Sequence, residues 1–595
     1  MTKVIRRLSG PPALLEQQRD HRVAHGRVEG KIAHSAVRRV IVALWILIVP
    51  FFVYATPYAV AKSRGTNGLA VATFTVDEAL YLTEARALAE GRPPNWNPWT
   101  REFGSSRSKY RHFAGALIPA AIWWRIGGDP TMGLGVAAGA CAALTSLITF
   151  LILRRLVDDV HVWTATALAP LAILVPFDAI GTISHLALDP TNLAETLPLG
   201  RPFTSQWGVC VFALGLLCVV RVLEHPRRSR IAALIVSLML ELYTFPYAVP
   251  LTLGVHALLV GLSTPSRPWR DGWWPLACAC GALVLLAPWA ASGTSFVAGL
   301  TPLSEEAARF GGSGVMLLML VLAAALLRSA VRRPMGLFLP ACGLMISAGR
   351  VSDVVFPAGA KIAQHVNYLG GIVTAWLVLG LIGIALRRWR PPLAYGLAAA
   401  CGVAAVVWAT YTTAAAYRSR DESLSSAAAW ASMLAALPLD RHTTLLVEGE
   451  SNGGPGSWAG LYSRAPVFYA ALGEHAPSPS FEDRVWRRAW YHYWRGLSAE
   501  DIDRQGLAVA ESYPRFIGAG NRVPALGVMT LMRDRLAQVA FRTPEALAFL
   551  RGLGRIVCVE SAATPTFQHA RLAASLALIT DYTTAGFHVS VYEAR

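Results

Sequence analysis

Long runs of apolar residues alternate along the chain with short polar stretches that are rich in arginine. A helix needs about 20 apolar residues to cross a bilayer, and many of these runs reach or approach that length. Several are shorter, so we expect about ten to thirteen membrane spans, and the pattern favours eleven. The predicted spans cover residues 40–61, 131–153, 161–178, 205–222, 231–243, 246–262, 273–291, 314–327, 335–348, 368–386 and 392–416.

Clusters of arginine recur in every second connection between these spans. The clusters are Arg154–Arg155, Arg227–Arg228–Arg230, Arg267–Arg270, Arg328–Arg332–Arg333 and Arg387–Arg388–Arg390. Cytoplasmic loops carry an excess of Lys and Arg, so these connections are predicted to be cytoplasmic. The basic segment 1–39 is then a cytoplasmic tail before a retained first span. An odd number of spans would put residues 418–595 on the extracytoplasmic side.

The chain changes character after the last apolar run. Strand-like runs occur at Thr444–Val447, Arg555–Val559 and His588–Tyr592, with helix-like stretches at Phe481–Arg495 and Pro544–Leu553. Such alternation predicts an α/β domain over residues 418–595, a length that suffices for its own core. The expected fold is therefore a polytopic α-helical membrane domain over 40–417, with about 11 transmembrane helices, followed by an extracytoplasmic α/β domain.

Composition and charge agree with this picture. Hydrophobic residues make up 54% of the chain and charged residues only 15%, a balance typical of membrane proteins. The formal net charge of +17 would also suit nucleic-acid binding, but the cations are concentrated between apolar runs, which argues against that partner. The eight cysteines show no zinc-like spacing, so no metal site is predicted from them.

The first extracytoplasmic loop, residues 62–130, is much longer than the other connections. Apolar positions recur with helical spacing between Thr75 and Gly91, which predicts an amphipathic helix lying along the membrane surface. A second apolar stretch, Phe113–Trp124, is too short to span comfortably. We expect it to be another interfacial helix.

Two acidic residues, Asp77 and Glu78, stand at the start of the first predicted loop helix. Acids at this position commonly satisfy free backbone N–H groups and suit the helix dipole, and this structural role explains the pair by itself. A carboxylate at the membrane boundary is also placed to remove a proton from an acceptor hydroxyl. Both interpretations remain open from the residues alone.

Basic residues gather in a late extracytoplasmic segment that otherwise lacks charge. The group comprises Arg350, Lys361, His365 and Asn367. Ionisable groups at membrane depth are costly and usually functional, and cations here could hold a lipid phosphate. They could equally anchor the chain among lipid headgroups by snorkelling.

The connection 181–207 is also unusually long, which suggests that it lines a cavity. Its polar residues include Asp189 and Arg201, which we count as candidate substrate-binding groups. For each of them an ordinary solvated role is the simpler interpretation.

The order of these features resembles the GT-C superfamily of membrane glycosyltransferases. The features are an apolar span, Asp77-Glu78, a surface helix closing at Gly91, and Tyr110-Arg111-His112 before an apolar helix. More narrowly, they are similar to the protein O-mannosyltransferase and aminoarabinose-transferase type. The sequence departs from that type at His112-Phe113-Ala114, where many relatives have a His-Pro or Pro-Pro step.

The resemblance implies transfer of a sugar from a polyprenyl-phosphate donor to a glycan, lipid or protein hydroxyl. Asp77, or else Glu78, would be the general base. Arg350 and Lys361 would bind the donor phosphate, with His365, His112, Asp189 and Arg201 as further substrate-binding candidates. No cofactor is required, although paired acids can hold a divalent cation. The arginine-rich and alanine-rich composition favours a bacterial plasma membrane and an undecaprenyl or decaprenyl phosphate carrier, with a eukaryotic dolichol carrier as the alternative. The alternatives are a transporter or flippase, and a non-catalytic assembly or sensor protein.

Overall fold

A computed structural model gives the fold. It describes residues 40–63, 76–93, 95–102, 114–128, 130–156, 162–175, 204–262, 272–291, 337–355, 362–386, 391–419, 421–437, 439–440, 442–449, 455–470, 481–498, 501 and 525–595.

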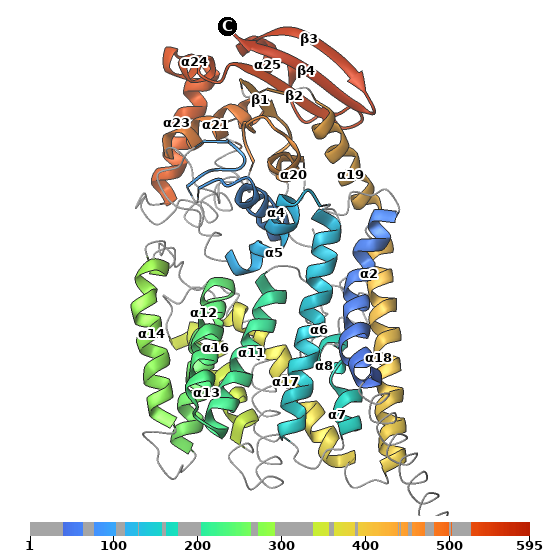
Figure 1. Ribbon diagram of the computed structural model, residues 1–595. Helices are drawn as coiled ribbons and strands as arrows, with labels where there is room; N and C mark the ends of the chain where they lie inside the picture. The colour runs from blue at the N-terminus through green and yellow to red at the C-terminus, as the bar shows by residue number, and fades with distance from the viewer. Residues whose placement is uncertain are drawn as a thin grey trace, which may run out of the picture.

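The molecule has a long helical bundle below and a mixed sheet with its helices above, as drawn in Figure 1. The helices of the bundle are η2 (Leu44–Ile48), α2 (Val49–Ser63), α6 (Pro130–Leu156), α7 (Val162–Leu168), α8 (Leu171–Leu174), α11 (Thr204–Glu224), α12 (Arg228–Thr244), α13 (Ala248–Leu262), α14 (Trp274–Ala291), α16 (Phe338–Val355), α17 (Ile362–Leu386) and α18 (Pro391–Ser419). Two helices, α4 (Val76–Ala89) and α5 (Ala114–Arg125), lie between the bundle and the sheet.

Three helical segments among the described residues are long and apolar enough to cross a membrane. They are Val40–Val60, Met132–Arg155 and Gln206–Glu224. Shorter apolar helices accompany them at Trp163–Leu174, Ala248–Leu262, Trp274–Leu285, Phe338–Gly349, Leu369–Gly383 and Tyr395–Tyr411. Their length and composition indicate an integral membrane protein.

Helices occupy the positions of the predicted spans wherever the structure describes them, with one irregularity. The run 161–178 is not one helix, because a turn at Ala169-Pro170 separates α7 from α8. Proline has no backbone N–H and clashes with the preceding turn, which breaks a helix at that point. The predicted span 314–327 lies outside the described residues.

The C-terminal part contains a four-stranded sheet in the order β1-β2-β4-β3. β1 pairs with β2 in parallel, and the other pairings are antiparallel. The strands are β1 (Thr443–Leu446), β2 (Arg555–Ser561), β3 (Leu576–Thr584) and β4 (Phe587–Ala594). The helices are α19 (Asp421–Ala436), α20 (Pro455–Tyr462), α21 (Phe481–Trp494), α23 (Ala525–Ala540), α24 (Pro544–Arg551) and α25 (His569–Ser575).

Side chains alternate between the two faces of this sheet, and each face has its own core. Leu446, Ile556 and Tyr592 pack with the aromatic residues of α21, including Trp490. The opposite face belongs to a hydrophobic cluster that continues through α19, α20 and α4 into the helical bundle. Because side chains alternate between the two faces of a strand, one face of the sheet packs on α21 and the other packs toward the bundle.

The expected helix in the first long loop is present, but it is not exposed along a polar face. Every residue from Leu80 to Ala85 is buried, including Glu84, which is 0% exposed. The cause is packing on both sides, because α4 contacts α5 and also α20 from the C-terminal part. The burial of Thr83 and Glu84 differs from what the amphipathic pattern indicated, whereas the position of α4 along the membrane surface stays a prediction. The second loop helix is confirmed as α5.

Candidate functional site

Asp77 and Glu78 lie in the first turn of α4, directly after Val76. The first backbone N–H groups of a helix have no partner within it and form a region of positive potential. The helix places the two acids at the end of α4 that follows the first apolar segment of the bundle.

Arg350 and His365 lie on neighbouring helices, α16 and α17, at the same level. A Cβ atom placed on Gly349 would lie 3.0 Å from a methyl carbon of Val366. Each of these two residues is next in sequence to one of the candidates, so the backbones of Arg350 and His365 lie close together where α16 meets α17.

The helices that hold these candidates meet at one end of the bundle. A Cβ atom on Gly115 of α5 would lie 2.1 Å from Thr244 Oγ1, at the last residue of α12. One on Gly349 of α16 would lie 3.3 Å from Leu251, in the first turn of α13. The last residue of α12 and the first turn of α13 are close together, because only a short turn joins the two helices. Therefore α5 and this part of α16 lie at the same end of the bundle, and α4, which packs on α5, lies there too.

The remaining predicted site residues, Lys361, His112, Asp189 and Arg201, lie outside the described residues. Within the described part of the chain, no group of three or more His, Cys, Asp or Glu residues is placed to hold a metal ion.

Glu241, which the sequence analysis did not include in the site, is buried between helices of the bundle. Its carboxylate accepts a hydrogen bond from Thr252 Oγ1 at 2.9 Å, which links α12 to α13. A Cβ on Gly215 of α11 would meet the same carboxylate at 1.9 Å. The position is thus a close three-helix contact.

The loop 92–102, which follows α4, contacts the C-terminal part through one buried tryptophan. Trp99 is 1% exposed, and its indole Nε1 donates to the carbonyl oxygen of Gly456 at 3.1 Å. Its own carbonyl accepts from the backbone N–H of Val467 at 2.8 Å. A turn built on Asn97, whose Oδ1 accepts from the N–H groups of Trp99 and Thr100, presents the indole.

Charged side chains reinforce this contact. Arg101 donates to the carbonyls of Ser463 at 2.5 Å and Ala465 at 3.3 Å. Its φ of +58° is unfavourable for a residue with a Cβ, so these bonds hold a strained turn. Arg487 of α21 donates to Glu102 at 2.9 Å.

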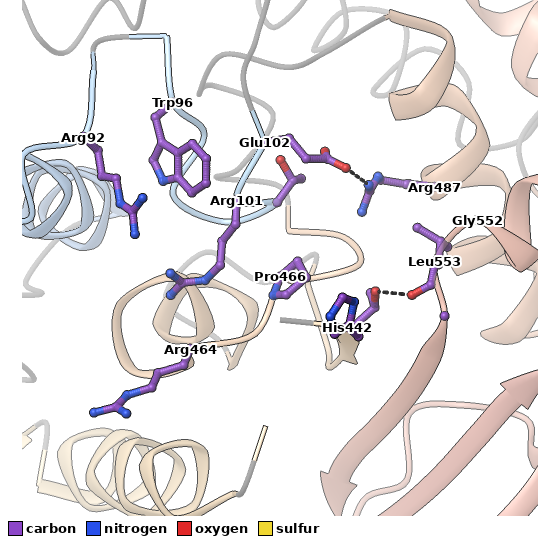
Figure 2. A pocket seen from close by; sticks show the side chains of 13 residues that line it. Arg92, Trp96, Arg101, Glu102, His442, Arg464, Pro466, Arg487, Gly552 and Leu553 are labelled. Carbon is purple, nitrogen blue, oxygen red and sulfur yellow. Dashed lines mark hydrogen bonds and ion pairs between the residues drawn. The ribbon is translucent and has the colours of Figure 1, made fainter. Parts of the chain in front are cut away.

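A cavity of about 380 Å³ opens at this junction, with the side chains arranged as in Figure 2. Four separate segments of the chain form its wall. They contribute Arg92, Trp96, Thr100, Arg101, Glu102, His442, Thr444, Arg464, Pro466, Arg487, Gly552, Leu553 and Gly554. Four of these side chains are guanidinium groups and one is a carboxylate. The sequence analysis missed this cluster, because no local spacing links residues that lie more than 350 positions apart.

Comparisons with known proteins give structural likeness only. No family model matches the chain, and no curated protein matches it. Among solved structures, the chain is similar to ArnT from Cupriavidus metallidurans bound to undecaprenyl phosphate, with a TM-score of 0.39 and 12% identity. It is also similar to the apo state of ArnT, with a TM-score of 0.38 and 13% identity. Both alignments cover 86% of this chain and 92% of the other. At these TM-scores the likeness assigns neither a family nor an activity.

Proposed function

We propose that this protein is a membrane glycosyltransferase that moves a sugar from polyprenyl phosphate to an acceptor hydroxyl on the extracytoplasmic side. The observation that supports it most is the position of the acidic pair. Asp77 and Glu78 open a helix that follows the first apolar segment and lies between the bundle and the C-terminal part. A lipid-linked donor requires a reaction site at such a boundary, because its chain stays in the bilayer while its sugar extends into water.

The reaction is a single displacement at the anomeric carbon. Asp77 takes the proton of the acceptor hydroxyl as that oxygen forms its bond to the sugar. The bond between the anomeric carbon and the phosphate oxygen breaks, and polyprenyl phosphate leaves with the electron pair. A single displacement inverts the anomeric configuration.

The leaving group needs cations more than it needs a general acid, since a phosphate monoester is already a stable anion. Arg350 and Lys361 neutralise the charge that grows on the phosphate. The placement of Arg350 and His365 at the α4–α5 end of the bundle supports this division of roles. His365, His112, Asp189 and Arg201 complete the proposed substrate-binding set.

The orientation follows from the arginine-rich connections. The N-terminus is cytoplasmic, and the sheet lies on the extracytoplasmic side of a bacterial plasma membrane. The sheet is joined to the acid-bearing helix by the Trp99 contact and the charged pairs around it. It is therefore suited to hold an acceptor close to α4.

The test is release of polyprenyl phosphate by the purified full-length protein. A panel of polyprenyl-phosphate hexoses and pentoses is incubated with the protein and an envelope extract as acceptor source, and the products are quantified by mass spectrometry. Asp77→Asn is expected to slow release about 100-fold or more, the contribution of a general base.

The matched control is Glu545→Gln. Glu545 is an exposed acid in the first turn of α24. Its replacement therefore removes a negative charge from a helix N-terminus, as Asp77→Asn does, but at a position with no proposed role in the reaction. Release at the wild-type rate by Asp77→Asn and by Glu78→Gln would contradict the proposal. Movement of the intact lipid-linked sugar across a vesicle membrane, without release, would replace it with a flippase.

A further inference from the structure

We infer that the arginine-lined cavity between the first loop and the C-terminal part binds a sugar that bears a phosphate or carboxylate group. The cavity is lined by residues of the loop 92–102, of the segment 442–466, of α21 and of the turn before β2. It lies apart from Asp77, since the loop residues that line it follow the C-terminal end of α4.

The charge of the lining favours an anion. Arg92, Arg101, Arg464 and Arg487 are among the residues that line the cavity, against one carboxylate from Glu102. Arginine presents a rigid fork of N–H donors that matches the oxygens of a phosphate or carboxylate. Arg464 is exposed on the cavity wall, and Figure 2 shows its side chain extending from the segment beside Pro466.

Polar atoms that lack a hydrogen-bond partner point to the rest of the ligand. Thr100 Oγ1 and Glu102 Oε2 are each buried without a hydrogen bond, and both residues line this cavity, whereas Arg92 Nε is paired with Glu90 at 3.5 Å. Buried polar groups are almost always paired, so two such atoms in one place indicate that a ligand supplies their partners. Because Glu102 Oε2 can only accept, the ligand must also bring donors, as sugar hydroxyls do.

An aromatic ring completes the chemistry. Trp96 lines the cavity, and the Arg92 guanidinium lies 4.8 Å from its ring centroid. The indole supplies apolar surface for the C–H face of a sugar ring, while guanidinium groups hold the anionic substituent. The volume of about 380 Å³ is within the usual range for small-molecule sites.

The identity of this site as one for the acceptor rests on the proposed function. An anionic glycan bound here would lie beside the C-terminal end of α4 and would have to extend along that helix to bring a hydroxyl to Asp77 at its other end. The binding itself does not depend on that reaction and can be measured without it.

The experiment is titration calorimetry of the full-length protein in detergent, with glucose 1-phosphate as probe. Glucose and inorganic phosphate are the comparison probes. Wild type is expected to bind glucose 1-phosphate more tightly than either. Arg464→Gln is expected to weaken this binding about tenfold, and Arg92→Gln/Arg464→Gln further, because each removes a charged donor from the anion.

Arg533→Gln is the matched control, since Arg533 is exposed on α23 and does not line the cavity. It should bind like wild type, and so should Asp77→Asn. If Asp77→Asn loses sugar transfer but still binds glucose 1-phosphate, the proposed reaction and the proposed binding site are tested separately. Thermal melting verifies that each variant is folded. Equal binding of glucose 1-phosphate by wild type and the double variant, or binding of inorganic phosphate as tight as that of the sugar phosphate, would overturn the inference.

Discussion

His492 is buried in the aromatic core beneath the sheet, where it is 4% exposed. Burial, and then the charge of Arg488, lower the pKa of this imidazole to about 3. Arg488 Nε donates to His492 Nε2 at 3.1 Å, which requires that nitrogen to be an unprotonated acceptor. The native fold therefore holds a neutral histidine.

This histidine predicts a loss of stability in acid. The unfolded chain takes up a proton near pH 6.5, whereas the folded chain resists it to about pH 3. The lowered pKa therefore costs no stability above pH 6.5, and its cost grows as the pH falls from 6.5 toward 3. The slope from this one group is about 1.4 kcal/mol per pH unit. His492→Gln, which keeps an acceptor for Arg488 but cannot titrate there, should flatten the dependence of the melting temperature on pH between 4 and 6.

The control for this prediction is His225→Gln, because His225 is exposed beyond the end of α11. It should melt with the wild-type pH dependence. Equal slopes for wild type and His492→Gln would show that the buried imidazole does not govern acid unfolding.

Among the candidate site residues, some can be predicted from the local sequence and others cannot. Asp77 and Glu78 stand out because a pair of acids directly follows an apolar segment, a pattern visible within one stretch of chain. Arg101 and Arg487 look like ordinary solvated charges in the sequence. Only the folded chain brings them to one cavity wall. A site assembled from distant segments leaves no local spacing to detect.

Among the elements, the strands with buried positions were predicted and the exposed strand was not. All of β1 is buried, and β2 is buried from Ile556 to Glu560. Both follow an apolar pattern that is typical of strands. β3, which pairs only with β4, is exposed almost throughout. Its sequence lacks the alternation that burial on one face would impose.

The packing of α4 is a second feature that the sequence could not predict. Its helical period was visible in the sequence, yet the burial of Thr83 and Glu84 was not. Their cover comes from α5 and from α20, a helix more than 350 residues later in the chain. Amphipathic periodicity identifies a helix, but it cannot show which partner covers its polar face.

The close approach of α5 to α12 leads to a prediction for this pair of helices. A methyl group at position 115 would meet Thr244 Oγ1 at 2.1 Å and the carbonyl oxygen of Tyr243 at 3.3 Å. Gly115→Ala should therefore push α5 from α12 and lower the stability by about 1–3 kcal/mol, as overpacking does. The measurement is the melting temperature of the protein in detergent.

Gly281→Ala is the matched control, since Gly281 lies within α14 with no atom within 4 Å of the added methyl. Alanine is the better helix former, so this change should leave stability unchanged or raise it. A melting temperature for Gly115→Ala at or above that of wild type would contradict the tight α5–α12 contact.

At the scale of the whole molecule, the bundle and the sheet are joined by one continuous hydrophobic cluster. It includes Phe212 of α11, Leu82 of α4 and Val559 of β2. The sequence predicted a helical membrane part and an α/β part, but it did not predict that α4 and the loop after it would join them. This junction is where both proposals lie.

The most direct test of the central claim is mass spectrometry of lipids that copurify with the protein. Wild type, Asp77→Asn and Arg350→Ala/Lys361→Ala are extracted in detergent and compared. A polyprenyl-phosphate sugar should copurify with wild type and with Asp77→Asn, and it should disappear from the cationic double variant. That pattern would name the donor and separate its binding from the chemistry. Retention of the same lipid by the double variant, or a different lipid in place of a polyprenyl phosphate, would contradict the proposed glycosyltransferase function.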